Sequence, residues 1–391
     1  MKRTMLIILV VVIFLALAKV IWFLLATRGH GSFEGEKKEI IHRANYLTSK
    51  VVTSPKELLS EMGSGLGAQF QGEWALYSCS MTTAALANIA ILYPQNKDMA
   101  IMFIEQIIDI ALSPDIYEYD AIRWMEDPLE GIYGDVSHIS YYSHIAWMIS
   151  RYKQIGGDNK FDDMYHELCE AMNRRIRQSP YLNLPTYPEE YIYIPDMLVA
   201  IVALHNYSCQ YNKKEYAETV NMWIERAKKE WTDKETGLVV SFLLDQNDGT
   251  AENGLEIKGS YSALNCYYLS LIDPEFAKQQ YDLLKQFFKQ RYPANGIREY
   301  CDRPYLFGFD VDAGPIIFNL SPSGTAFAIG AATSLGDMAF RQQLLNTAEI
   351  AGSTVTWFGK SHYLLANWFL VGEAITLAMR TSAPETRVTG K

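Results

Sequence analysis

The sequence predicts an all-α protein, an (α/α)6 toroid or six-hairpin barrel, and two observations predict it. Six stretches of helical length contain no Asp, Glu, Lys or Arg, and they cover residues 76–93, 136–150, 197–211, 259–272, 316–335 and 361–372. A charged, amphipathic stretch follows each of the first five, at residues 97–112, 159–178, 213–230, 274–290 and 337–350. A helix without a charged face must be buried all round, whereas a helix with a charged stripe keeps one side in water. The alternation therefore indicates an inner ring of helices inside an outer ring.

The spacing of the uncharged stretches gives the order of the predicted ring along the chain. They begin at intervals of about sixty residues, which fits one helical hairpin and one long loop per repeat. Five outer stretches leave the sixth inner helix without a partner. We expect residues 37–60, the first soluble helix, to supply that partner by packing beside residues 361–372. One toroidal domain is then expected over residues 37–380, followed by a flexible tail at residues 381–391.

Long loops precede the uncharged helices. They cover residues 113–135, 179–195, 232–258 and 291–315. In an alternating ring, all loops that enter inner helices lie at the same end. We therefore expect these loops to meet at a single mouth, and loops held on a rigid scaffold are where functional residues concentrate.

The N-terminus differs in kind from the rest of the chain. Two basic residues precede an apolar run from Thr4 to Ala26 that only Lys19 interrupts. The run is long enough to cross a bilayer, and it continues past a small-residue triplet at which a cleaved signal peptide, the alternative, would end. Because positive charge stays on the cytoplasmic side, we expect the soluble domain outside the cytoplasm. The expected segments are a transmembrane signal anchor at residues 1–27 and a Gly-rich linker at residues 28–36.

Composition and short motifs exclude several classes of function. The 391 residues carry a net charge of −10 and show no basic stripe, so nucleic acid is not an expected partner. The five cysteines form no CxxC pair and no Cys/His cluster at zinc spacing, which predicts neither a disulfide framework nor a metal site. The chain also contains no P-loop, GxGxxG or GxSxG motif. The sequence therefore implies no metal and no organic cofactor.

The loop at residues 113–135 and the helix after it supply the first candidate site residues. Trp124 and Tyr133 lie in the loop, where aromatic rings with polar tips suit a ligand-binding cleft. His138 and His144 follow on the uncharged helix, six positions apart and therefore on different faces. Either histidine is suited to general acid or base catalysis, and a hydrogen-bonded core histidine is the alternative for each.

The loop at residues 179–195 places carboxylates among aromatic rings. Glu189, Glu190 and Asp196 lie close in sequence to several tyrosines, among them Tyr191. A carboxylate in such surroundings can have a raised pKa and can act as an acid. The alternative is that the glutamates are solvated and that Asp196 caps the next helix.

A third loop, at residues 291–315, is crowded with Arg, Asp and Glu. Asp310 and Asp312 lie in a DxDxG segment that resembles part of a calcium loop, but the terminal Glu of the twelve-residue pattern is missing. A structural network of Arg and carboxylate groups fits this pattern. Paired catalytic carboxylates, as in glycoside hydrolases, fit it as well.

Several stretches of the chain resemble the linalool dehydratase-isomerase family. They are SYYSHIAWMISRYKQIGGDNKFDDMY, QSPYLNLPTYPEEYIYIPDMLVAIVALHNY, WTDKETGLVVSFL and GSYSALNCYYLSLIDPEFAKQQY, in the family's order and spacing over residues 70–345. The resemblance implies an exported, oligomeric, cofactor-free (α/α)6 enzyme that dehydrates and isomerises monoterpene alcohols, and hence a homo-oligomer here. It implies an active-site role for His144, Tyr77 and Tyr261. The chain departs from the family at residues 186–195, where both active-site cysteines and the adjacent glutamate are missing.

These observations lead to one main interpretation and two alternatives. The main interpretation is a membrane-anchored, exported lyase or isomerase that acts by acid–base chemistry on a small, hydroxylated, largely apolar molecule. Its catalytic residues are expected to be His144, Asp196, Glu190, Tyr77 and Tyr261. Its substrate-binding residues are expected to be Trp124, Tyr133, His138, Glu189, Tyr191, Asp310 and Asp312. The first alternative is a glycoside hydrolase or carbohydrate lyase that uses paired carboxylates on the same toroid, and the second is a non-catalytic envelope scaffold.

Overall fold

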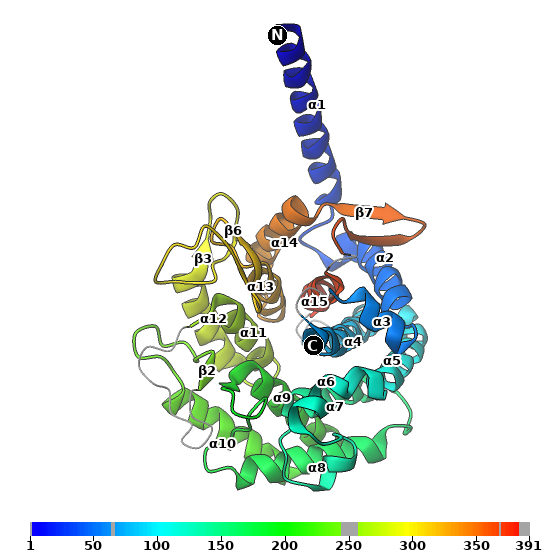
Figure 1. The fold of residues 1–391 in the computed structure, drawn as a ribbon, viewed down its shortest axis with the longest axis vertical. Helices are drawn as coiled ribbons and strands as arrows, with labels where there is room; N and C mark the ends of the chain where they lie inside the picture. The colour runs from blue at the N-terminus through cyan, green and yellow to red at the C-terminus, as the bar shows by residue number, and fades with distance from the viewer. Residues whose placement is uncertain (1, 64–66, 244–256, 367–368, 383–391) are drawn as a thin grey trace.

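An inner ring of helices forms the centre of the protein in the computed structural model (Figure 1), which describes residues 2–63, 67–243, 257–366 and 369–382. Within these residues the inner helices are α4 (Ala68–Leu92), α7 (Ile139–Gln154), α9 (Ile194–Tyr211), α11 (Gly259–Ser270), α13 (Pro322–Ser334) and α15 (Leu370–Thr381). Each inner helix packs against the next, and α15 packs back against α4, which closes the ring. The predicted all-α toroid is confirmed.

An outer ring of amphipathic helices covers the inner one. Its members are α2 (Phe33–Val51), α5 (Lys97–Ala111), α8 (Asp162–Gln178), α10 (Lys214–Glu230), α12 (Pro274–Phe288) and α14 (Met338–Gly352). Each of the last five follows an inner helix in the chain and packs against it, whereas α2 precedes α4 and contacts both α4 and α15. The N-terminal segment therefore closes the ring beside the last inner helix, as the sequence led us to expect.

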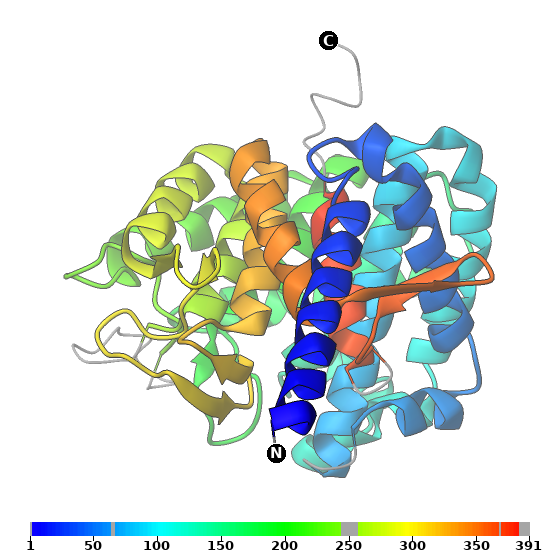
Figure 2. The same ribbon diagram turned by 90° about the horizontal axis from the view of Figure 1, so that it is seen from above.

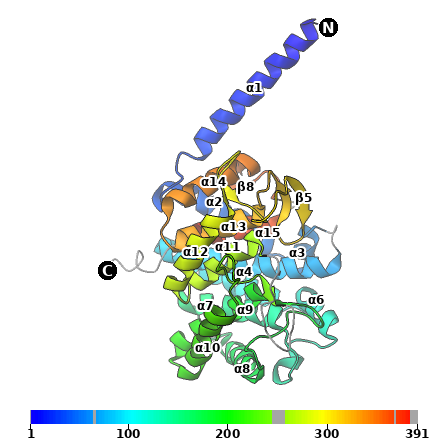
Figure 3. The same ribbon diagram turned by 90° about the vertical axis from the view of Figure 1, so that its left-hand side faces the viewer.

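The connections that enter inner helices lie at one end of the ring, which we call the mouth. Figure 3 shows α3, α6 and β5 together at this end. The short elements in these connections are α3 (Pro55–Glu61), α6 (Pro114–Trp124), η3 (Glu130–Tyr133), β1 (Ile192–Tyr193), β2 (Phe242–Leu243), β3 (Lys289–Gln290), β4 (Gly296–Ile297), β5 (Phe307–Asp310), β6 (Gly314–Ile317), β7 (Thr354–Trp357) and β8 (Lys360–Tyr363). The strands pair as four antiparallel two-stranded ribbons, and β5 pairs with β6 in the register Phe307↔Ile317. The turn η2 (Pro94–Asn96) joins α4 to α5 at the opposite end.

Two predicted helices differ in kind from the structure. The sixth uncharged stretch, residues 361–372, is not an inner helix: it contains β8 and only the first turn of α15. The absence of charge fails as a criterion here because α15 carries Glu373 and Arg380, both buried and both paired inside the protein. Residues 37–60 form two helices and not one, because Ser54 and Pro55 begin α3 with a capping box and a proline in its first turn.

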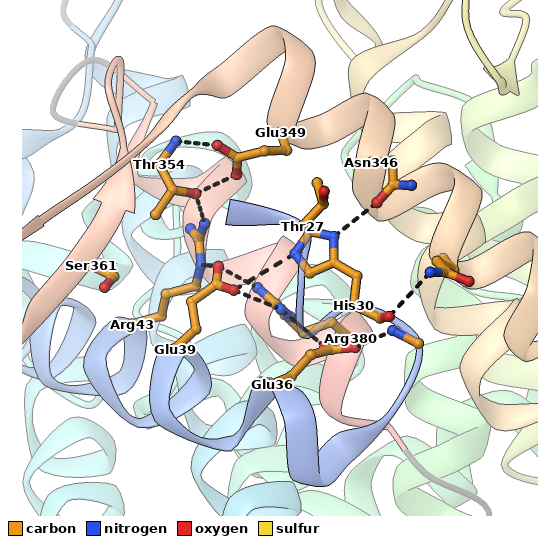
Figure 4. Close-up of polar contacts among 12 residues, drawn as sticks. Thr27, His30, Glu36, Glu39, Arg43, Asn346, Glu349, Thr354, Ser361 and Arg380 are labelled. Carbon is orange, nitrogen blue, oxygen red and sulfur yellow. Dashed lines mark hydrogen bonds and ion pairs between the residues drawn. The ribbon is translucent and has the colours of Figure 1, made fainter. Parts of the chain in front are cut away.

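A network of buried charges locks the first outer helix, α2, to the end of the chain (Figure 4). Arg341 of α14 donates two hydrogen bonds to Glu36, of 2.6 and 2.7 Å, and Arg380 of α15 donates to Glu36 at 2.9 Å. Arg380 also reaches Glu39 at 2.9 Å. Arg43 pairs with Glu39 at 2.8 Å and donates to Thr354 of β7 at 2.6 Å. Burial raises the pKa of Glu36, but Arg380 and Arg341 outweigh that effect and hold it at about 2.

The expected linker at residues 28–36 is held against the domain. α2 already begins at Phe33, with Ser32 as a side-chain N-cap. The ring of His30 hydrogen-bonds Asn346 of α14 at 3.0 Å, and the His30 carbonyl accepts a hydrogen bond from Gln342 at 3.1 Å. Most of the expected tail, residues 383–391, lies outside the described residues.

The first helix, α1 (Lys2–Ala26), projects away from the ring (Figures 1 and 3). Its segment Ile7–Ala26 has a mean hydropathy of 3.0, and none of it is buried against the rest of the protein. By length and composition it is able to cross a membrane. Gln69–Leu92, within α4, meets the same criteria but is 83% buried as a core helix of the toroid. One apolar N-terminal helix is therefore compatible with a signal anchor or a signal peptide.

Candidate active site

Solvent reaches a small set of polar side chains on the inner helices at the mouth. Glu73 and Tyr77 on α4, Asp196 on α9 and Tyr261 on α11 are each partly exposed, although the residues that follow Asp196 and Tyr261 and precede Tyr77 are buried. Each lies within the first three turns of its helix, which is the end that faces the mouth. These four side chains therefore line the space into which the long connections open.

Glu73 is the single charged residue of α4. Burial is the main cause that raises the pKa of its carboxyl, and the negative charges of Asp196 and Asp312 raise it further, to about 8. A hydrogen bond from Tyr187 acts in the opposite direction. Glu73 is therefore mostly protonated at neutral pH and is able to donate a proton.

Asp196 is the single Asp, Glu, Lys or Arg of α9. Its carboxylate accepts a hydrogen bond of 2.8 Å from the Thr186 hydroxyl, and no side chain caps the N-terminus of α9, so the capping alternative is wrong. Burial and the charge of Asp312 raise the pKa of Asp196 to about 6, against the effect of Thr186. Asp196 is therefore mostly ionised at neutral pH, while Glu73 is not.

A lysine and two aspartates border this pair of acids. Lys258, at the start of α11, donates to Asp310 at 2.9 Å and to Asp312 at 2.8 Å, and both aspartates lie at the turn between β5 and β6. Although burial lowers the pKa of Lys258, the two aspartates raise it above its usual range. Tyr261 lies beside Asp312 and Asp196; burial and these two charges raise its pKa, so it stays a neutral hydroxyl. The structural network that the sequence left open is thus present, with Lys258 as its cation.

His144 lies below the mouth, on α7. It is buried, its Nδ1 hydrogen-bonds the Ser80 hydroxyl at 2.8 Å, and its ring meets Tyr77 edge to face at 5.0 Å. Burial lowers the pKa of His144 to about 3, so the imidazole is neutral. A neutral ring in this place positions Tyr77 and Ser80. Tyr77 itself has a raised pKa, chiefly because of burial.

This chain is similar in fold to enzymes that act on sugars. Over 95% of this chain and 98% of the other, it superposes with an unsaturated glucuronyl hydrolase specific for heparin, with a TM-score of 0.56 and 12% identity. A glycoside hydrolase of family 105 from C. acetobutylicum gives a TM-score of 0.53 at 11% identity, over 78% and 92% of the two chains. A family 88 glycosyl hydrolase from Bacteroides vulgatus gives 0.51 at 12% identity, over 90% and 97%. The sequence matches no family model and no curated protein.

These comparisons correct the functional prediction. Dehydration and isomerisation of a small alcohol, the main interpretation of the sequence, is wrong, because the solved structures that share this fold are carbohydrate-active enzymes. They favour the alternative based on paired carboxylates. The six-hairpin architecture that the sequence resemblance implied is confirmed, and the linalool dehydratase-isomerase family itself is not.

The contacts described for three other predicted site residues involve neither Glu73 nor Asp196. His138 is fully buried, with Asp120 on its Nδ1 at 2.5 Å and Glu126 on its Nε2 at 3.3 Å. Trp124 lies against the His138 ring at 5.9 Å. Tyr133 is 74% exposed and donates to Glu167 of α8 at 2.7 Å. These contacts join α6 to the start of α7, so the role of His138 and its two acids is structural.

The glutamates of the 179–195 loop also differ from each other. Glu189 is exposed, whereas Glu190 pairs with Arg123 of α6. Tyr191 is 40% exposed and stacks on Phe242 at 4.9 Å, across the β1–β2 ribbon at the mouth. Tyr191 therefore presents a flat aromatic surface close to Asp196.

Glu73 and Lys258 are the residues that the sequence predictions missed. The sequence did contain a signal for Glu73. A single acid in a long, otherwise uncharged helix cannot lie on a solvated face, so it is expected to have a special role. No comparable signal marks Lys258, since its two partners are more than fifty positions away in the chain. Among the residues that the structure describes, no cluster of three or more His, Cys, Asp and Glu side chains is able to hold a metal ion, and the five cysteines are unpaired.

Proposed function

We propose that the protein is a glycoside hydrolase that cleaves an oligosaccharide at the mouth of the toroid, with Glu73 as general acid and Asp196 as general base. The observation that carries the proposal is that each acid is the single carboxylate of an uncharged inner helix and is partly exposed at the same end of the ring. Their surroundings give the two groups different protonation states at neutral pH. When one carboxyl group is protonated and the other is ionised, the first can act as the general acid and the second as the general base of glycoside hydrolysis.

The proposed reaction needs only these side chains and water. Glu73 donates its proton to the glycosidic oxygen, and the bond between this oxygen and the anomeric carbon breaks. Asp196 takes a proton from a water molecule whose oxygen bonds to the anomeric carbon. The neutral hydroxyl of Tyr261 is placed to hydrogen-bond a sugar hydroxyl, and Tyr191 offers a ring face for stacking. The products are two sugars with free hydroxyls, after which the two carboxyl groups return to their starting states by exchange with solvent.

We also propose that α1 is a signal anchor that holds the toroid outside the cytoplasm. The two basic residues at its N-terminal end and its exposed apolar surface support this orientation. Alkaline phosphatase fused after residue 40 is expected to be active in a bacterial host. An inactive phosphatase together with a fluorescent cytoplasmic reporter at that position would contradict the orientation.

A panel of neutral, acidic and unsaturated oligosaccharides tests the hydrolase proposal. Glu73→Gln and Asp196→Asn are each expected to lower kcat by about 10²–10⁴-fold, the usual contribution of a general acid or base. Glu61→Gln is a matched control, because Glu61 is an acid of similar exposure on α3 that pairs with Lys50 at 2.7 Å. Wild-type protein that releases reducing ends from no member of the panel, or variants that keep full activity, would reject the proposal.

A further inference from the structure

Two hairpins in the connections that enter inner helices expose large apolar side chains to solvent. Phe358 is 90% exposed and Trp357 is 71% exposed, and both lie at the turn between β7 and β8. Phe307 and Phe309 on β5, and Phe318 just after β6, are also exposed, and the rings of Phe307 and Phe318 lie 5.0 Å apart. Clusters of exposed apolar rings are uncommon on proteins that stay in water, and they mark contact with a protein or a membrane.

The two hairpins lie on either side of α1. Figure 1 shows α1 leaving the ring between β6 and β7, and Figure 2, viewed from above, shows the β5–β6 hairpin on one side of α1 and the β7–β8 hairpin on the other. α1 also contacts the domain directly, because it packs against α14 and because Lys19 hydrogen-bonds the Ser353 hydroxyl. Ser353 immediately precedes β7, so the base of the β7–β8 hairpin is tied to α1.

The position of Lys19 along α1 shows which part of the helix contacts the β7–β8 hairpin. Ile7–Ala26 is 20 residues long, and at 1.5 Å per residue it spans roughly 30 Å, the thickness of the hydrocarbon core. Lys19 lies seven positions before the end of α1, which is about 10 Å along the helix axis. The Lys19–Ser353 contact therefore ties the base of the β7–β8 hairpin to the last third of α1, the part of the helix nearest to the domain.

We infer that the tips of the β5–β6 and β7–β8 hairpins insert into the interface of the phospholipid bilayer beside α1. The inference rests on the proposed anchor and does not depend on the proposed hydrolase activity. Aromatic side chains are favoured at the boundary between headgroups and hydrocarbon, and exposed Lys360 follows the Trp357–Phe358 tip as a cation for lipid phosphate.

The experiment places a nitroxide spin label on the full-length protein in nanodiscs of phosphatidylcholine and phosphatidylglycerol. The label is attached in Phe358→Cys, and the matched control is Met125→Cys, because Met125 is 92% exposed at the end of α6, on the part of the ring away from α1. Both variants also carry Cys209→Ser and Cys301→Ser, since the other three cysteines are buried. The measurement is the accessibility of each label to dissolved oxygen, which concentrates in lipid, and to a water-soluble nickel chelate.

At position 358 we expect a several-fold higher ratio of oxygen to nickel accessibility than at position 125. Equal ratios in protein that has entered the discs would overturn the inference and leave the anchor intact. Low accessibility to both reagents at position 358 would also overturn it, because the label would then be covered by protein, such as a second copy of the chain. Protein that does not enter the discs would overturn the anchor and this inference together, and in each case the hydrolase assay would be unaffected.

Discussion

The pKa of Glu73, on α4, is raised first by burial and then by the negative charge of Asp196, on α9, a helix that is not its neighbour in the ring. The effect places the pKa of Glu73 at about 8 and leaves that of Asp196 at about 6. Between these values one carboxyl group is protonated and the other is ionised. The toroid thus holds one protonated and one ionised carboxyl group at the same mouth.

The first expected outcome is a bell-shaped dependence of kcat/KM on pH. Activity should fall below about pH 6 as Asp196 becomes protonated, and above about pH 8 as Glu73 loses its proton. Asp312→Asn should move both limbs to lower pH, because the Asp312 charge raises the pKa of both acids. The control is Asp310→Asn, which removes the charge of the other partner of Lys258 and should move the limbs less. Limbs that stay in place in Asp312→Asn would contradict the assignment.

The second expected outcome concerns stability, and its sign follows from the raised pKa of Glu73. Its carboxyl has a pKa of 4.5 when unfolded and about 8 when folded, so the folded state holds an additional proton between these values. Its contribution is fully present below pH 4.5 and is lost as the pH rises through 8. Glu73→Gln should therefore raise the free energy of unfolding by about 1–3 kcal/mol at about pH 9, allowing for partial exposure, with little change at about pH 5.

Urea unfolding at the two pH values checks this prediction. Glu61→Gln serves again as the control, and its effect should be small at both pH values because Glu61 is paired near the surface. If Glu73→Gln loses activity and gains stability only at the higher pH, the ionised Glu73 carboxylate destabilises the fold and is needed for activity. Equal effects at both pH values would show that the change in stability arises from packing and not from charge.

The sequence predicted most of the fold and only part of the site, for physical reasons that particular residues make clear. Burial on all sides excludes unpaired charge, so the uncharged stretches within α4, α7, α9, α11 and α13 reveal those helices directly. The absence of charge did not reveal α15, because this helix contains Glu373 and Arg380, which are buried with partners on α2. No local sequence pattern shows such long-range pairing. Asp196 was recognised from the rings around it. Lys258, which holds Asp310 and Asp312, was not, because the loop that brings them together has no regular period.

The two histidines of α7 are expected to contribute differently to stability. His138 is buried between Asp120 and Glu126, so His138→Ala leaves the fully buried carboxyl group of Asp120 with the Ser140 hydroxyl but without its histidine partner. A buried polar group that loses a hydrogen-bond partner costs about 1–3 kcal/mol, and because His138 bonds two carboxyl groups, His138→Ala should destabilise the protein more than His144→Ala. His144→Ala removes a neutral ring that bonds only Ser80 among the polar groups described, and it should cost about 1–3 kcal/mol.

Thermal unfolding and kinetics of the folded protein separate the two roles. His144→Ala should lower kcat by disturbing Tyr77, whose ring it contacts at 5.0 Å, and should leave both limbs of the pH profile in place because the neutral imidazole does not titrate there. A limb that disappears in His144→Ala would show that the imidazole itself exchanges the proton. A His138→Ala variant as stable as wild type would contradict the structural role of the Asp120–His138–Glu126 group.

The closure of the ring by α2 should depend on the buried charges that join it to α14 and α15. Arg341→Met removes both hydrogen bonds of 2.6 and 2.7 Å to the fully buried Glu36, and it should destabilise the domain by about 3–5 kcal/mol because that carboxylate then keeps only Arg380 and the Gly31 N–H. The double change Arg341→Met with Glu36→Gln should recover part of this loss, since no unpaired charge remains.

Because the pKa of Glu36 is lowered from 4.5 to about 2, its contribution to stability is present above pH 4.5 and is lost as the pH falls through 2. Denaturant unfolding at neutral and acidic pH checks both statements, and a double variant less stable than Arg341→Met would show that Glu36 contributes through its contacts and not through its charge.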